Sequence, residues 1–142
     1  LTPYRQRNII VVTGNAADPD RARQLEDNGV RVMYAGDGVL VDGAEMVKQL
    51  AIAGYRSLYA IAGPGVFHTL VAGGILDRLY LTLACQLLGG QDFDTLLHGD
   101  ALLPAAGLSM TALHHDPIAP DGGQLFGVFE PAPLSQTAPR TA

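Results

Sequence analysis

Gly63, Pro64 and Gly65 form a turn between an apolar stretch and an amphipathic one, and these residue types can bind an anion. The N-terminus of a helix carries unpaired N–H groups and about half a positive charge. Glycine lets a phosphate approach the backbone without meeting a Cβ atom, and proline suits the first helical position. The turn matches neither of the common glycine-rich phosphate motifs, and such turns also use glycine for packing. Phosphate binding and a purely structural turn both stay open.

The single cysteine and a pair of histidines could also do chemistry. Cys85 stands in an apolar stretch with no base near it in the sequence, so we expect a buried structural thiol rather than a nucleophile. His114 and His115, followed by Asp116, have the composition of a metal site. Adjacent side chains of a strand point to opposite faces, however, so one ion could not hold both imidazoles. We expect a solvated or dimer-facing pair and no metal.

Alternating strand and helix patterns position the glycine turn in the first half of the chain. Asp18 can cap a helix that starts at Pro19, and Gly29 can end it. Strands that alternate with helices imply right-handed crossovers and parallel strands. The predicted strands are residues 8–13, 30–36 and 56–62, and the predicted helices are residues 19–28, 44–54 and 63–74.

The second half of the chain is strand-like throughout. Residues 77–89, 108–119 and 122–131 have no convincing helix between them, so we expect antiparallel pairing and a mixed sheet. Residues 79–88 are apolar at nearly every position and need cover on both faces. We therefore predict a homodimer whose interface includes residues 79–88 or 108–129.

Length and composition limit the class of protein. A chain of 142 residues suits one domain, which we place at residues 1–130, with a disordered tail at residues 131–142 that is rich in Pro, Ala, Ser and Thr. The net charge is −5 and no cluster of Lys or Arg could follow a nucleic acid backbone. The apolar runs are too short to span a bilayer, and residues 1–8 do not have the charged and then apolar pattern of a leader. We expect a cytoplasmic protein that binds neither nucleic acid nor membrane.

Residues 57–90, "SLYAIAGPGVFHTLVAGGILDRLYLTLACQLLGG", resemble the reductase domain of the riboflavin-pathway deaminase-reductase, whose fold is like that of dihydrofolate reductase. Members of that family have an apolar strand, E-G-G-P-T-L, a helix and a second strand ending in L-L-G-G. Gly63 and Pro64 match the G-P, residues 73–79 match the end of the helix, and residues 87–90 match the last motif. Residues 8–36 are similar to the family's strand-helix-strand segment. The resemblance covers residues 8–130.

The resemblance implies a three-layer α/β fold with a mixed, mainly parallel sheet, and NADPH as cofactor. It implies a small-molecule substrate, a ribosylamino-pyrimidine, and assembly as a homodimer. Thr13 and Gly14 would lie near the adenosine ribose and its 2′-phosphate. Arg21 or Arg23 could assist there, although a solvated helix face is the favoured interpretation for both. The residues expected beside the pyrophosphate are Gly63, Pro64, Gly65 and Val66, and Ile61 and Ala62 just before them are also expected in the cofactor-binding site.

Two departures from the family pattern leave the activity open. Ile61 and Ala62 replace the acidic residue and the first glycine of the motif. The family domain also begins with a strand and turn that read S-L-D-G, and we expect this N-terminal part to be absent here, either because the chain is a fragment or because it is a shortened homologue. No catalytic residue is predicted. The alternatives are a nucleotide-binding or dimerisation module without turnover, and an unrelated nucleotide-binding α/β protein.

Overall fold

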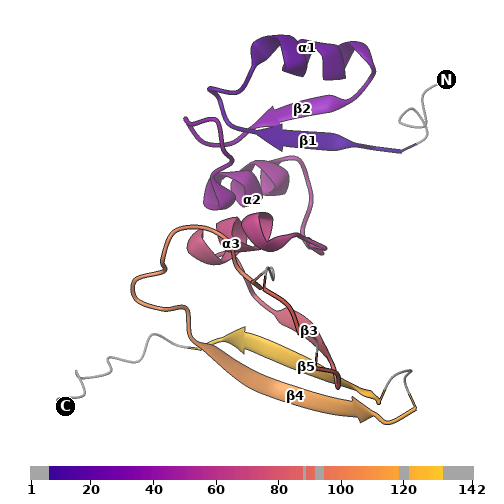
Figure 1. Ribbon diagram of the computed structural model, residues 1–142. Helices are drawn as coiled ribbons and strands as arrows, with labels where there is room; N and C mark the ends of the chain where they lie inside the picture. The colour runs from indigo at the N-terminus through magenta and orange to yellow at the C-terminus, as the bar shows by residue number, and fades with distance from the viewer. Residues whose placement is uncertain (1–6, 88, 92–94, 119–121, 133–142) are drawn as a thin grey trace. The chain divides into compact units, whose positions relative to one another are not determined.

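The computed structural model describes residues 7–87, 89–91, 95–118 and 122–132 (Figure 1). The chain forms two compact units, Leu1–Ile75 (unit 1) and Leu76–Ala142 (unit 2). One domain over residues 1–130 stays a prediction. The tail predicted at residues 131–142 falls, from residue 133 onward, outside the described residues.

Unit 1 begins with a β-α-β element. Strand β1 (Ile10–Thr13) pairs in parallel with β2 (Arg31–Tyr34), with Thr13 opposite Tyr34, and helix α1 (Pro19–Asp27) connects them. This pairing confirms the first predicted crossover. The buried apolar side chains among the described residues all belong to this element, and they are Ala22, Val30, Met33 and Ala35.

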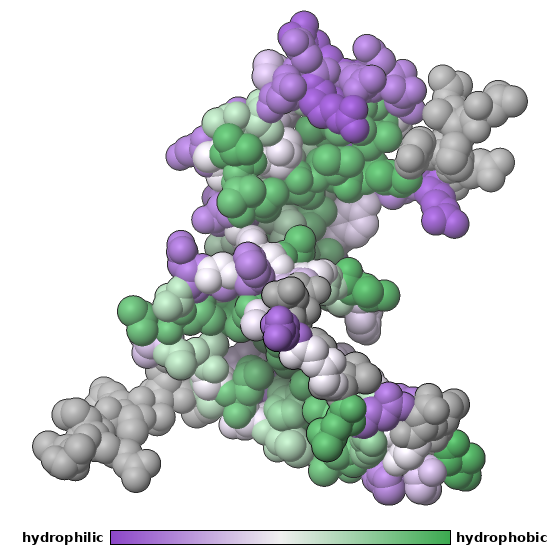
Figure 2. Space-filling view, viewed as in Figure 1, coloured by the Kyte–Doolittle hydropathy of each residue, from purple (hydrophilic) through white to green (hydrophobic). Residues whose placement is uncertain are grey.

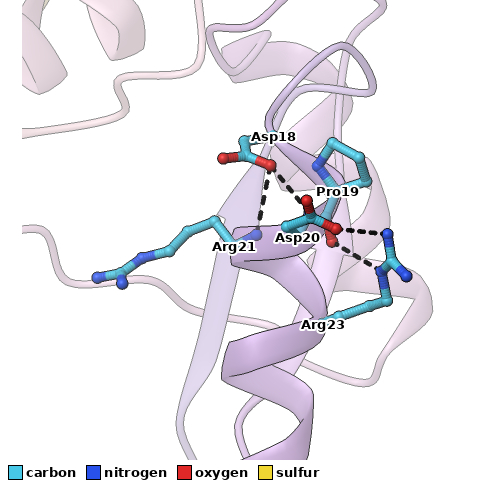
Figure 3. Close-up of polar contacts among 5 residues, drawn as sticks. All are labelled: Asp18, Pro19, Asp20, Arg21 and Arg23. Carbon is cyan, nitrogen blue, oxygen red and sulfur yellow. Dashed lines mark hydrogen bonds and ion pairs between the residues drawn. The ribbon is translucent and has the colours of Figure 1, made fainter.

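Helix α1 begins where its capping residues predict. Asp18 Oδ1 accepts hydrogen bonds from Asp20 N at 2.9 Å and from Arg21 N at 3.5 Å (Figure 3). Pro19 follows at the first helical position, where no N–H is needed. Arg23 pairs with Asp20 at 2.6 Å, and both side chains are exposed, so the pair adds little stability. Figure 2 shows hydrophilic side chains gathered over this helix.

Helices α2 (Gly43–Ile52) and α3 (Pro64–Ala72) contact each other through two glycines. A Cβ atom on Gly43 would lie 2.7 Å from Thr69 O of α3, and one on Gly73, which ends α3, would lie 3.2 Å from Ala44 N of α2. A distance of 2.7 Å leaves no room for a side chain, so the backbones of the two helices can approach this closely only because Gly43 has none.

The third predicted strand, residues 56–62, is wrong for this structure. The segment has no regular secondary structure, and Tyr59 and Ile61 are 91% and 107% exposed. A strand needs a neighbour to accept and donate its backbone hydrogen bonds, and no described strand pairs with this segment. A hydrogen bond of 3.0 Å from Asn8 Nδ2 to Tyr55 Oη links only its start to the start of β1. The glycine turn at Gly63 therefore leads into a helix, as predicted, but does not follow a strand.

Unit 2 is an antiparallel sheet in the order β3-β5-β4. Its strands are β3 (Leu79–Ala84), β4 (Leu108–Asp116) and β5 (Gln124–Pro131), and the register shifts between Met110 and Ala112. The antiparallel pairing of the second half is confirmed. The mixed α/β class is confirmed as well, with the parallel and the antiparallel pairs in separate sheets.

Apolar and reactive side chains of unit 2 are more exposed than the sequence suggests. Cys85, expected to be buried, is exposed. Tyr80 and Leu83 are 64% and 55% exposed. Burial in a strand depends on whether another layer covers its face, and no described element of unit 2 buries these side chains. His114 and His115 are both exposed. Among the described residues no group of three His, Cys, Asp or Glu could hold a metal ion.

None of the described helices is long and apolar enough to cross a bilayer.

Candidate cofactor-binding site

The N-terminus of α3 is open. Gly63 precedes the helix with an extended backbone (φ −73°, ψ 169°) and provides no side-chain cap. The first helical hydrogen bond runs from Phe67 N to Gly63 O at 2.9 Å. The N–H groups of Gly65 and Val66 come before it and have no acceptor within the helix. A Cβ atom on Gly63 would meet nothing within 4 Å. The turn therefore offers two N–H groups to an anion.

The start of α3 differs in charge from the starts of α1 and α2. The first turn of α3 holds no acidic residue, whereas α1 and α2 are capped by Asp18 and Asp42 and carry further acids, Asp20 and Glu45, in their first turns. Among the described helices, α3 is therefore the one whose N-terminal partial positive charge is not compensated by a capping side chain or by an acid of its own first turn. Ile61 and Ala62, which precede the turn, are exposed and add no charge.

Thr13 and Gly14 lie at the carboxyl end of β1, in contact with the loop that follows β2. A Cβ atom on Gly14 would collide with Gly38 O and lie 2.7 Å from Leu40 O. Gly14 is buried. Because Gly14 has no side chain, the backbone of this loop can pack against it. The role predicted for Thr13 and Gly14 in binding the cofactor stays a prediction.

A cleft of about 790 Å³ lies at the carboxyl ends of β1 and β2. Ligands of open α/β sheets bind in crevices at this end of the strands. The loops after both strands and the first two turns of α2 form its walls. The polar side chains that line the cleft are Asn15, Tyr34, Asp37, Asp42, Glu45, Lys48 and Gln49.

The cleft is acidic. Asp42 Oδ1 caps α2 by accepting from Glu45 N at 2.8 Å. The pKa of the Glu45 carboxyl lies below its ordinary value because its oxygens accept from Gln49 Nε2 at 2.7 Å and from Lys48 Nζ at 3.2 Å. Lys48 is the cation that lines the cleft, and Glu45 already pairs with it. Asp37 also lines the cleft, which therefore has three carboxylates and one lysine in its walls.

The predicted helper arginines lie elsewhere. Arg21 Nη1 donates to Gln24 Oε1 at 2.8 Å, Arg23 pairs with Asp20, and neither arginine lines the cleft. This agrees with the interpretation of a solvated helix face.

Sequence reasoning missed the acidic cleft because it treated "DGVLVDG", residues 37–43, only as a turn. Asp37 is the third residue after the second strand of the β-α-β element, and Asp42 comes directly before a helix. An acid at each of these two positions is a signal that could have revealed the cleft.

Comparisons with known proteins agree with the fold. Thirteen chains of solved structures match. One is a pyrimidine reductase-like protein from Corynebacterium diphtheriae, with a TM-score of 0.70 and 21% sequence identity over 87% of this chain. The match covers 50% of that protein, so this chain spans half of its length. A search of the curated proteins found no match. The structural likeness defines a reductase-like α/β fold, consistent with that of dihydrofolate reductase.

The family follows from the sequence match. Residues 3–121 match the model of the RibD C-terminal domain, which is more than half of the chain. The chain belongs to the family of RibD C-terminal domains, as its resemblance to the riboflavin-pathway reductase implies.

Proposed function

We propose that this chain provides the cofactor-binding surface of a reductase of the riboflavin-biosynthesis type, similar to 5-amino-6-(5-phosphoribosylamino)uracil reductase. The substrate would be a ribosylamino-pyrimidine. The cofactor would be a reduced nicotinamide dinucleotide, for which the family resemblance implies NADPH. When bound, the dinucleotide supplies the hydride that turns the ribose into a ribityl chain. Membership of the RibD C-terminal domain family supports the reductase class.

The observation that carries the proposal is the uncapped N-terminus of α3. The pyrophosphate of a dinucleotide is an anion that accepts hydrogen bonds, and Gly65 and Val66 offer it two N–H groups at the positive end of a helix dipole. The open space at Gly63 lets the phosphate reach them. The residues at this end of the helix therefore fit the phosphates of the cofactor, while Ile61 and Ala62 border them with apolar surface.

Bulk at position 65 tests this role. The substitution Gly65→Val places a branched side chain where the phosphate would lie. We expect at least tenfold weaker binding of the reduced dinucleotide to the full chain, measured by the fluorescence of its nicotinamide, with little change in thermal unfolding. Ala72→Val adds a similar side chain at the exposed far end of α3 and is the control. Unchanged affinity in Gly65→Val would remove the phosphate role of the turn.

A second candidate function is a nucleotide-binding or dimerisation module without turnover. The observation that favours it is Ile61, an exposed apolar side chain in a position where the resembled family has an acid. Oxidation of the reduced dinucleotide in the presence of the ribosylamino-pyrimidine separates the two. Binding without oxidation would identify the module, and substrate-dependent oxidation would identify the reductase.

Assembly as a homodimer in the cytoplasm belongs to the same proposal. The exposed side chains of Tyr80 and Leu83 on β3 support an interface at this strand, because isolated apolar surface of this kind favours association. Leu83→Arg should give a monomer by light scattering at micromolar concentration. A monomeric parent protein would contradict the dimer and leave the reductase proposal intact.

A further inference from the structure

We infer that the cleft at the carboxyl ends of β1 and β2 takes the unphosphorylated ribose of an adenine dinucleotide, so that this chain prefers NADH to NADPH. The inference rests on the proposed function, since it assumes that a nicotinamide dinucleotide is bound. It departs from the cofactor that the family resemblance implies, and it follows from the charges of the cleft.

Asp37 is placed to bind ribose hydroxyls. It follows β2 and Gly36, whose φ of 95° turns the chain sharply at the edge of the sheet. In β-α-β dinucleotide sites, an acid at the end of the second strand accepts hydrogen bonds from the ribose, whereas an arginine there accommodates a 2′-phosphate. Asp37 is exposed and lines the cleft. Within the described part of the chain, its carboxylate has no hydrogen bond or ion pair.

The cleft repels a phosphate group. A 2′-phosphate would bring up to about two further negative charges beside Asp37, Asp42 and Glu45. Lys48 cannot balance them, because Glu45 already pairs with it at 3.2 Å. The N-terminus of α2 cannot do so either, because Asp42 caps it and Glu45 lies in its first turn. Ribose hydroxyls carry no charge and can donate to the same carboxylates.

The cleft also offers surface for the adenine ring. Tyr34 and Leu40 line it and are 41% and 84% exposed, so a planar base would cover apolar surface that is otherwise in water. A metal ion is a poor alternative occupant, because no group of three acids, histidines or cysteines in the described residues converges on one point.

Equilibrium titration of the full chain with NADH and with NADPH tests the inference, and adenosine and adenosine 2′-monophosphate serve as probes of the cleft alone. We expect NADH to bind at least tenfold more tightly than NADPH, and adenosine more tightly than its 2′-phosphate. The preference should shrink as salt is added, since salt screens the repulsion. Asp37→Asn should reduce the preference at least threefold. Glu26→Gln makes the same change of charge on exposed α1, away from the cleft, and should leave it unchanged.

The outcomes distinguish this inference from the proposed function. Equal or tighter binding of NADPH would overturn the inference while the proposed function stands. An unchanged preference in Asp37→Asn, with thermal unfolding like that of the parent, would overturn the assignment to this cleft. Absence of binding by either dinucleotide would overturn the proposed function and the inference together.

Discussion

Two glycine turns of unit 1 are both predicted to contact the cofactor, one near the adenosine ribose and one beside the pyrophosphate, and the structure gives them opposite surroundings. Gly14 is covered by the carbonyls of Gly38 and Leu40, whereas the space in front of Gly63 is empty. Asp37, Asp42 and Glu45 line the cleft beside the first turn, whereas the first turn of the helix that follows Gly63 holds no acid. A glycine at the end of a strand or the start of a helix can therefore make room either for the protein's own backbone or for a ligand. The atoms that surround the glycine decide between the two.

The largest effect that separates the two turns is on stability. Gly14→Ala forces a Cβ atom against two carbonyl oxygens, and we expect a loss of about 3 kcal/mol in the free energy of unfolding, the scale of overpacking in a closed site. Gly63→Ala meets no atom and should change stability by less than about 1 kcal/mol. Chemical denaturation of both variants measures the difference. Equal losses would mean that the two turns are packed alike.

A charge at the open turn should abolish its preference for anions. Gly63→Asp places a carboxylate at the N-cap of α3, and we expect about tenfold weaker dinucleotide binding, or ~1.4 kcal/mol. Gly63→Asn is the matched control, because asparagine caps a helix about as well as aspartate and carries no charge. Both variants should unfold at similar temperatures. Comparable affinity in the two variants would show that charge at this helix end does not matter.

The opposite change, removal of a negative charge, can be made at Asp42, which lines the acidic cleft. Asp42→Ala removes the hydrogen bond to Glu45 N and should cost about 1 kcal/mol of stability, as measured by denaturation. Asp42→Ser keeps a capping oxygen without the charge, so its stability should stay within about 0.5 kcal/mol of the parent. The serine variant should also bind NADPH several-fold more tightly. If serine costs as much as alanine, the charge of Asp42 contributes more than its hydrogen bond.

The smallest expected effect is a pH dependence at Glu45. Hydrogen bonds from Gln49 and Lys48 place its folded pKa below the unfolded one, so its contribution to stability is present above the unfolded pKa of about 4.3 and is lost as pH falls through the folded value. Glu45→Gln should flatten the fall of stability between about pH 5 and pH 3. Melting curves across this range measure it, with Glu26→Gln as the control. A variant curve as steep as that of the parent would contradict the assignment.

Local signals predicted the helices well. Asp18 and Pro19 start α1, and Gly63 and Pro64 start α3, because capping depends on residues that are adjacent in sequence. Residues 56–62 have the composition of a strand, yet pairing needs a neighbour that composition does not show. The predicted burial of Cys85 is wrong for a similar reason. An apolar strand indicates that its faces favour burial, but it does not show whether another layer packs on them.

The candidate site was predictable in part. The glycine turn before α3 was found because all its residues are consecutive. The cleft was not found, since Asn15, Asp37 and Glu45 meet only when β1 and β2 pair and α2 packs beside them. Asp37 and Asp42 stand in the sequence as acids near the ends of predicted elements, but only folding shows that they share one site with Glu45.

The contact between α2 and α3 has a consequence for which molecules the chain could accept. Gly43 and Gly73 let the two helices touch with no side chain between them at the closest point. The first two turns of α2 form one wall of the acidic cleft, and α3 begins with the candidate anion-binding turn, so the close contact of the two helices helps to set how far apart these two sites lie. A single methyl group at position 43 would push the two helices apart. A ligand that contacts both the cleft and the start of α3 would then lose its contacts with one of them.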